Sequence, residues 1–195
     1  GRVLRVAQAL QARGIPFRLS LLGDGPDRPR YEAWVQANSL DGVSFLGWVP
    51  RAQVADYYAA AHFILLPSQS EGWPKVLSEA MAYGVVPVAA AVSSIPQILG
   101  ETGAGVALPV DDIAGMAGAI AGFIAEPARW SAASRAGVAA AHRFTYSAYQ
   151  TAVTGLFAGA WGVHLAAPAG QTRPEAISVP ARHDAAGPYS RNGYH

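Results

Sequence analysis

The chain contains no cysteine, and Lys75 is the only lysine among its 195 residues. Without thiols it forms no disulfide and offers neither a thiolate metal ligand nor a cysteine nucleophile. Charged residues make up only 14% of the sequence and the formal net charge is +1, so electrostatics gives no reason to expect a nucleic-acid partner. No run of about 18 apolar residues occurs, and the sequence therefore predicts no transmembrane helix.

Several ligand-binding motifs are also absent from the sequence. No G-x-G-x-x-G follows a predicted strand and no Walker A sequence occurs, so the chain lacks the signatures of dinucleotide and P-loop binding. No two histidines have the spacing of metal ligands. We therefore expect neither a cofactor nor a bound metal.

Short apolar runs alternate along the chain with segments of helical periodicity. Hydrophobic residues make up 51% of the sequence, enough for one substantial folded domain. The runs are continuously apolar, which is typical of a parallel sheet covered by helices on both faces, so the predicted fold class is α/β and Rossmann-like. The predicted strands are 17–22, 43–46, 63–66, 85–91 and 105–108, and the predicted helices are 3–10, 28–38, 52–61, 75–83, 95–99, 112–125 and 128–141.

This topology divides the chain into a ligand-binding domain and a tail. Ligands of open parallel sheets bind at the carboxyl ends of the strands. The loops that follow the predicted strands are expected to converge on one crevice: 23–26, 47–50, 67–74 and 91–95. From about residue 166 the composition changes to Pro, Gly, Ala, Ser and Arg, without apolar periodicity. We therefore predict a folded domain over residues 1–160 and a disordered tail over residues 161–195.

The segment 71–79 carries the clearest chemistry. Glu71 precedes the predicted helix, and Glu79 lies inside it. The N-terminus of a helix, with its free N–H groups and positive dipole, is a ready anion site, and here an anionic phosphate would meet the amides near Lys75 and Val76. The two carboxylates would repel a phosphate and are better suited to accept hydrogen bonds from sugar hydroxyls. The segment therefore predicts a ligand with both phosphate and sugar.

The same segment resembles the motif of the family 4 glycosyltransferases, which are retaining enzymes of the two-domain GT-B fold. The carboxylate pair lies within Pro67-Ser-x-x-Glu-Gly-x-Pro and is followed by Glu79-Ala-Met-Ala-x-Gly84-x-x-Pro-Val88. Further matches are Gly23-Asp-Gly-Pro26, Val43-Ser-Phe-Leu-Gly47, Gly103-x-Gly105 with Pro109-x-Asp111, and Arg143-Phe-Thr-Tyr146. The resemblance covers residues 1 to about 158 and implies that the chain is the C-terminal, nucleotide-sugar-binding half of such an enzyme.

The resemblance implies a role for each matching residue. Glu79 would bind the ribose hydroxyls of the nucleotide, and Glu71, the residue assigned a catalytic role, would hold hydroxyls of the donor sugar near the reacting carbon. The sugar and diphosphate would meet Gly72, Trp73, Lys75 and Val76. The base would be bordered by Gly47, Trp48 and Val49, and the cleft would be lined by Gly23 and Asp24.

The implied reaction is sugar transfer from a nucleoside-diphosphate sugar with retention of configuration, on the cytoplasmic side. No residue of this chain needs to be a covalent nucleophile, and the sequence lacks the Asp-x-Asp that often marks a metal-held diphosphate. By the same resemblance, the family's first strand, its Arg and Lys, and the acceptor-binding N-terminal domain are missing from this chain. That domain would supply any enzymatic base, the acceptor site and a peripheral membrane contact.

Other interpretations stay open at the level of the sequence. The chain could be a nucleotide-sugar-binding module without turnover, or part of a GT-B-type sugar-nucleotide epimerase. Glu71 could serve only to cap the following helix, Glu79 could be a solvated helix residue, and Trp73 could pack rather than meet a ligand. A glycan phosphorylase would need a lysine for pyridoxal phosphate, and the setting of Lys75 does not suit that role.

Overall fold

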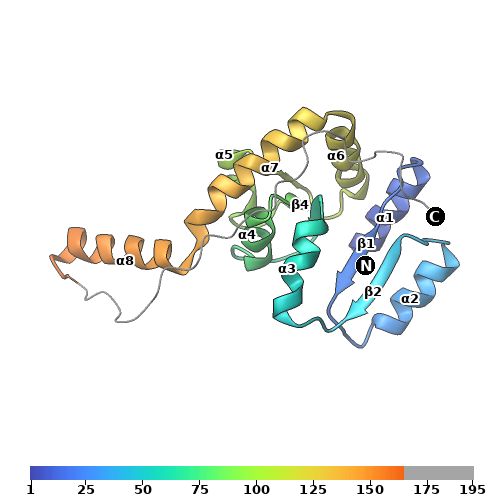
Figure 1. Ribbon diagram of the computed structural model, residues 1–195, viewed down its shortest axis with the longest axis horizontal. Coiled ribbons are helices and arrows are strands. Elements are labelled where there is room, and N and C mark those ends of the chain that lie inside the picture. The colour runs from blue at the N-terminus through green and yellow to red at the C-terminus, as the bar shows by residue number, and fades with distance from the viewer. Residues whose placement is uncertain (165–195) are drawn as a thin grey trace.

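The computed structural model describes residues 1–164 of the chain (Figure 1). Strands and helices alternate through most of this part, as the sequence predicts. The elements are α1 (Arg2–Ala12), β1 (Leu19–Leu22), α2 (Arg28–Ala37), β2 (Val43–Gly47), α3 (Arg51–Ala60), β3 (Phe63–Leu66), α4 (Lys75–Ala82), β4 (Val86–Ala90), α5 (Ile95–Thr102), β5 (Val106–Leu108), α6 (Ile113–Ala125), α7 (Pro127–Ala141), the 3-10 turn η1 (His142–Phe144) and α8 (Tyr146–Trp161).

The strands form two parallel sheets. β1 pairs with β2, starting at Leu19 opposite Val43, while β3, β4 and β5 form a second sheet with β4 in the middle. The predicted α/β class with parallel strands and helices on both faces is confirmed, and the structure divides the strands between two sheets. β1 is shorter than the predicted strand 17–22 because its pairing with β2 begins only at Leu19.

Helices cover both faces of the three-stranded sheet. Every residue of β4 is buried, and its successive side chains enter different clusters. Val88 packs with residues of α1 and α6: Val6, Leu10, Met116, Ala117 and Ile120. Ala89 packs on the other side with residues of α4, α5 and α7 and the turn before β5: Leu77, Met81, Ile95, Leu99, Ala104, Ala140 and Ala141. Full burial of a Leu or Met side chain stabilises the fold by about 1.5–3 kcal/mol, so these two layers hold β4 and its neighbours in place.

Glycines with positive φ end two helices beside the motif. Gly84 follows α4 with φ +72°, and its N–H donates to Met81 O at 2.9 Å. Gly84 comes directly after the C-cap residue Tyr83, where a left-handed glycine commonly ends a helix. Gly103, with φ +67°, ends α5. The helix predicted over 95–99 is therefore longer than expected, because Gly100 has no left-handed backbone and does not interrupt it.

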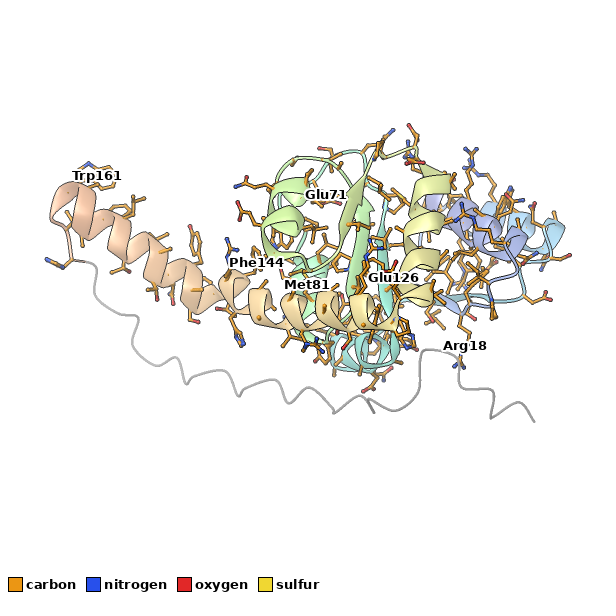
Figure 2. The ribbon with its side chains drawn as sticks, turned by 90° about the horizontal axis from the view of Figure 1, so that it is seen from above. Arg18, Glu71, Met81, Glu126, Phe144 and Trp161 are labelled. Atoms are coloured by element: carbon orange, nitrogen blue, oxygen red, sulfur yellow. The ribbon has the colours of Figure 1, made fainter. Side chains whose placement is uncertain are left out.

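The helix α8 was not predicted from the sequence. The Thr145 side chain accepts a hydrogen bond from Ala148 N at 3.2 Å and so caps its start. The helix projects away from the rest of the described chain, and none of its residues is buried (Figures 1 and 2). Trp161, assigned by the sequence to the tail, is the last residue of α8, and residues 165–195 of that predicted tail lie outside the described residues. Within residues 1–164, no helix combines the length and apolarity needed to cross a bilayer.

Candidate functional site

The loops that follow β1 and β2 contact each other. Gly23 N donates to Gly47 O at 2.7 Å, and both glycines have positive φ, +110° and +67°. The Asp24 carboxylate turns back on its own loop and accepts from Gly25 N at 2.8 Å. Two of the four predicted loops are therefore joined at residues that the sequence assigns to the cleft.

Beside these loops lies Arg28, a cation that is not among the site residues predicted from the sequence. Its side chain donates to Glu32 Oε1 at 2.7 Å and to Phe45 O at 3.3 Å, and it lies 3.9 Å from Asp24. The hydrogen bond to Glu32 raises the pKa of Arg28 above its ordinary value, so the guanidinium stays charged. The spacing of Asp24, Arg28 and Glu32 at i and i+4 was the signal in the sequence that could have identified it.

Trp48 and Val49 follow Gly47 in the loop after β2. The Trp48 side chain is 79% exposed, and Val49 is half-buried. An exposed indole on a loop at the carboxyl end of a strand is free to meet a planar ligand group. A contact of either residue with a base stays a prediction.

The loops that follow β3 and β4 are also joined. Ser94 Oγ donates to Gly72 O at 3.0 Å, which connects the loop 67–74 to the turn before α5. β3 and β4 are adjacent parallel strands, so their carboxyl ends lie at the same edge of the sheet. A Cβ atom at position 72 would meet no atom within 4 Å, so the backbone at Gly72 is open to close approach.

Trp73 makes packing contacts on the protein. Its ring stacks on Phe144, with the centroids 4.5 Å apart and the planes at 22°. Its indole N–H donates to the hydroxyl of Ser78 in α4. The stack joins the motif loop to the Arg143-Phe-Thr-Tyr146 segment, 71 residues further along the chain. Trp73 therefore packs on the protein, and a contact with a sugar stays a prediction.

No side chain caps the N-terminus of α4, the helix that carries Glu79. Pro74 stands at the N-cap position and Lys75 is the first helical residue, with its side chain exposed. Leu77 N donates to Pro74 O at 3.0 Å. The amides of Lys75 and Val76 precede Leu77 in the first turn, where the N–H groups of an α-helix have no acceptor within the helix. This helix end is therefore suited to an anion.

One apolar position of this helix is not buried as expected. The spacing of Val76, Leu77, Ala80 and Met81 predicts that all four lie against the sheet. Leu77, Ala80 and Met81 are fully buried, and Met81 lies against α7 (Figure 2), but Val76 is 40% exposed. Val76 is the second residue of α4 and so lies in the first turn of the helix.

The two acidic residues of the motif differ in their surroundings. Glu71 is half-buried on the loop before α4 (Figure 2), and Glu79 is exposed on the helix itself. Glu79 Oε2 accepts a hydrogen bond from the hydroxyl of Tyr58, in α3, at 3.3 Å. Burial, and secondarily the Glu79 carboxylate, raises the pKa of Tyr58 to about 12. Tyr58 was not among the predicted site residues, because no motif links it to Glu79.

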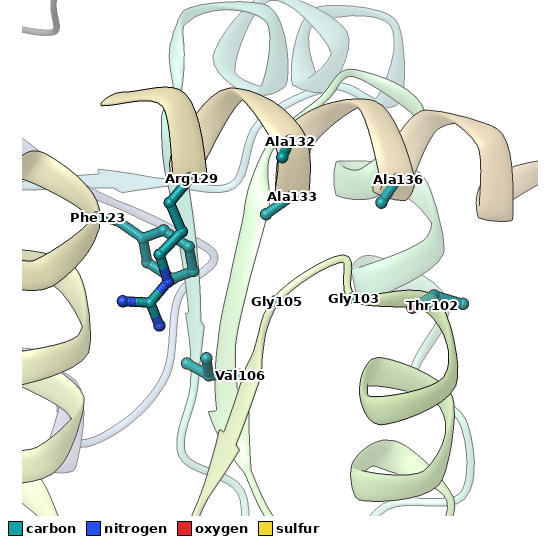
Figure 3. A pocket seen from close by; sticks show the side chains of 9 residues that line it. All are labelled: Thr102, Gly103, Gly105, Val106, Phe123, Arg129, Ala132, Ala133 and Ala136. Atoms are coloured by element: carbon teal, nitrogen blue, oxygen red, sulfur yellow. The ribbon is translucent and has the colours of Figure 1, made fainter. Parts of the chain in front are cut away.

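A hollow of about 370 Å³ lies away from these loops. It opens between α7 and the turn that precedes β5 (Figure 3), next to the amino end of that strand. Two of its lining residues contact each other: the Arg129 guanidinium lies over the Phe123 ring, 4.7 Å from the ring centroid. None of its lining residues belongs to the predicted site. Within residues 1–164, no group of three or more His, Cys, Asp or Glu side chains is placed to hold a metal ion.

The fold and the loops at the carboxyl ends of its strands place the chain in a class of proteins, the glycosyltransferases with the GT-B fold. Sucrose-phosphate synthase from Thermosynechococcus elongatus superposes with a TM-score of 0.69 and 29% identity, over 83% of this chain and 42% of that one. HepE from Anabaena, solved in complex with UDP, superposes with a TM-score of 0.68 over 80% of this chain and 44% of its own, and at 21% identity it supports the fold alone.

The chain belongs to the family Glycosyl transferases group 1, whose sequence model matches residues 2–148. A curated relative, the D-inositol 3-phosphate glycosyltransferase of Segniliparus rotundus, is 37% identical over 108 residues, which cover 55% of this chain and 24% of that protein. The chain thus spans about a quarter of that relative and about two fifths of the two solved structures. The matched residues include both carboxylates of the motif and all four loops.

Proposed function

We propose that this chain forms the donor site of an enzyme that transfers a sugar from a nucleoside-diphosphate sugar to an acceptor, with retention of configuration. The observation that carries the proposal is the pair Glu71 and Glu79 on either side of the uncapped N-terminus of α4. Family membership supports sugar transfer, and the UDP-bound neighbour supports a nucleotide on this fold. The choice of a nucleoside-diphosphate sugar as donor and the retention of configuration are both parts of what we propose.

The diphosphate of the donor is assigned to the first turn of α4. Negative charge develops on it as the sugar leaves, and fixed N–H dipoles that point at this charge lower the barrier. The open backbone at Gly72 allows the phosphate to approach, and the exposed ammonium of Lys75 adds a positive charge. In this scheme the protein stabilises the leaving group without a metal ion.

The carboxylates are assigned to hydroxyl groups of the donor. Glu79 would accept hydrogen bonds from the ribose, and Glu71, on the loop before the helix, from the sugar. A carboxylate that accepts from hydroxyls forms stronger bonds than a neutral acceptor does. Gly23 and Asp24 would form the cleft wall, while Gly47, Trp48 and Val49 would border the base.

Retention would follow if the acceptor attacks the face from which the diphosphate departs. The departing phosphate would then take the acceptor proton, and no carboxylate of this chain forms a covalent bond to the sugar. The acceptor and any further base are assigned to a second domain, since this chain spans a minor part of its relatives. A cytoplasmic location and a peripheral membrane contact of that domain stay predictions of the resemblance.

The test separates the two carboxylates by the ligand that each one holds. UDP, GDP and ADP, and the glucose conjugate of each, are titrated by calorimetry against the wild-type chain, Glu79→Ala and Glu71→Ala. Loss of hydrogen bonds to a charged group should weaken binding by about tenfold or more. Glu79→Ala should weaken nucleoside diphosphate and sugar conjugate alike, whereas Glu71→Ala should weaken mainly the conjugate.

Glu126→Ala is the matched control, because Glu126 lies on the surface between α6 and α7 and outside the proposed site (Figure 2). It should bind every ligand as the wild type does. If the Glu71 and Glu79 variants also bind all six ligands normally, the assignment of roles is wrong. A sugar-nucleotide epimerase would bind the same donors, and conversion of the donor sugar without an acceptor would favour that alternative.

A further inference from the structure

Tyr58 in α3 touches the proposed donor site from a helix that no motif assigns to it. We propose that Tyr58 is a positioning residue: its hydroxyl fixes one oxygen of the Glu79 carboxylate, so that the other oxygen is presented to the hydroxyls of the nucleotide ribose. This inference rests on the proposed function of Glu79. It adds to that function a residue from outside the sequence motif.

The contact has two parts, one to Glu79 inside α4 and one to Tyr83, the C-cap residue that follows this helix. The Tyr58 hydroxyl donates to Glu79 Oε2 at 3.3 Å, and the Tyr58 ring stacks on Tyr83, with centroids 5.8 Å apart and planes at 28°. Glu79 and Tyr83 are four residues apart in the sequence, and so lie on the same face of a helix. α3 therefore contacts α4 through the hydrogen bond to Glu79, and it contacts the C-cap of α4 through the ring of Tyr83.

The division of the carboxylate oxygens follows from hydrogen-bond chemistry. A phenol has one proton to donate, and a carboxylate has two oxygens that accept. In the described part of the chain, the Tyr58 hydroxyl is the side-chain donor to Glu79, and it uses Oε2. Oε1 is thus left for a ligand on the exposed side of the helix.

A contact that fixes the Glu79 carboxylate should help ligand binding because the Glu79 side chain is exposed. A free glutamate at a helix surface samples several rotamers, and ordering it on binding costs conformational entropy. The hydrogen bond from a ring that is itself stacked restricts that sampling before the ligand arrives. The pKa of Tyr58, raised to about 12, keeps the donor proton in place throughout the neutral pH range.

Substitution of Tyr58 by phenylalanine removes the hydroxyl and keeps the ring that stacks on Tyr83. The full chain with Tyr58→Phe is titrated with UDP and with UDP-glucose. We expect the Kd to rise about three- to tenfold, and by the same factor for both ligands, because both carry the ribose. If GDP or ADP is the nucleotide that the wild type binds, that nucleotide and its glucose conjugate replace them.

Tyr57→Phe is the matched control. It removes a tyrosine hydroxyl one residue away in the same helix, while the hydrogen bond to Glu79 comes from Tyr58, and it should leave both Kd values unchanged. A double-substituted chain separates positioning from general destabilisation. If Tyr58 acts through Glu79, then Tyr58→Phe should have no further effect in the Glu79→Ala background.

The outcomes distinguish this inference from the proposed function. If Glu79→Ala weakens binding but Tyr58→Phe does not, the donor site stands and the positioning role is overturned. Equal losses for Tyr58→Phe in the wild-type and Glu79→Ala backgrounds would also overturn it, because Tyr58 would then act independently of Glu79. If the wild type binds no nucleoside diphosphate, the proposed function fails and the inference fails with it.

Discussion

Single residues of the motif depend on partners that lie far from it in the sequence. The loop that carries Glu71 is tied at Gly72 to the side chain of Ser94, and Glu79 accepts a hydrogen bond from Tyr58. Trp73 stacks on Phe144. The spacing of the acids could be read from the sequence, but the groups that orient them could not, because each partner comes from another element.

The ionisation of Tyr58 provides a test at the same scale. The ordinary tyrosine pKa is 10.0, and in the folded chain burial and the Glu79 carboxylate raise the pKa of Tyr58 to about 12. A raised pKa contributes stability that is fully present below the unfolded value and is lost as the pH rises through the folded value. Tyr58 should therefore stabilise the fold below pH 10, and this contribution should disappear as the pH approaches 12.

Thermal unfolding of the wild type and of Tyr58→Phe, followed by circular dichroism from about pH 9 to about pH 12, measures this effect. The wild type should lose Tm more steeply than the variant over that range, and the two curves should converge at the alkaline end. Parallel curves would show that Tyr58 titrates as an ordinary exposed tyrosine. Tyr57→Phe again serves as the control for loss of a hydroxyl.

At the scale of elements, the sequence predicted most helices and strands to within a few residues. α4 was expected over 75–83 and spans Lys75–Ala82, and β3 was expected over 63–66 and spans Phe63–Leu66. Apolar periodicity and glycine positions are local signals, so such elements can be predicted without their neighbours. α8 (Tyr146–Trp161) was not predicted as a helix. The Arg143-Phe-Thr-Tyr146 match includes its N-cap residue, Thr145, but gave no sign of the helix that follows.

The end of α4 is an element boundary that should be sensitive to substitution. Gly84 has φ +72°, and a Cβ at this position would lie 2.6 Å from Ser134 Oγ in α7. The Ser134 hydroxyl also donates to Gly84 O at 2.7 Å, so α7 is held close to this turn. Gly84→Ala should lower the free energy of unfolding by about 1–3 kcal/mol, through left-handed strain and displacement of Ser134.

Urea unfolding measures this prediction, with Gly100→Ala as the control. Gly100 lies inside α5 without a positive φ, and a Cβ there meets no atom within 4 Å. Alanine at that position should leave the unfolding midpoint unchanged or raise it, since glycine weakens a helix interior by about 0.5–1 kcal/mol. A Gly84→Ala midpoint equal to the wild type would show that the turn relaxes freely.

At the scale of the whole molecule, the chain spans about a quarter of the curated relative and two fifths of the solved neighbours. The sequence predicted one parallel sheet, and the structure has two, β1–β2 and β3–β4–β5. α1 and α6 pack together over the larger sheet, and the partly buried Phe17, which precedes β1, lies against the same cluster. The two sheets are thus joined through side-chain packing.

This organisation predicts binding without efficient turnover. The 195-residue chain should bind a nucleoside diphosphate weakly, and its Kd should change by less than about twofold when EDTA is added, because the α4 amides and Lys75 are assigned to the phosphates. Transfer of sugar to an acceptor should be negligible, since the acceptor site is assigned to another domain. Calorimetry with and without EDTA, and product analysis with a labelled donor sugar, test both statements.

Strong transfer by this chain alone would contradict the division of labour between two domains. A large loss of affinity in EDTA that magnesium restores would instead contradict the assignment of the diphosphate to a metal-free site. The Glu126→Ala chain is the control for both measurements, because its substitution lies outside the proposed site.

The α/β class, the order and approximate bounds of most elements, and the spacing of Glu71 and Glu79 around the start of α4 could all be predicted from the sequence alone. These features depend on apolar periodicity, on glycine and on spacing along the chain, all of which are local. The packing of separate elements was needed to show that the strands form two sheets, that Gly23 donates to Gly47, and that Tyr58 donates to Glu79 across 21 residues of sequence. Such contacts depend on how separate elements pack, and this packing cannot be predicted from the spacing of residues along one element.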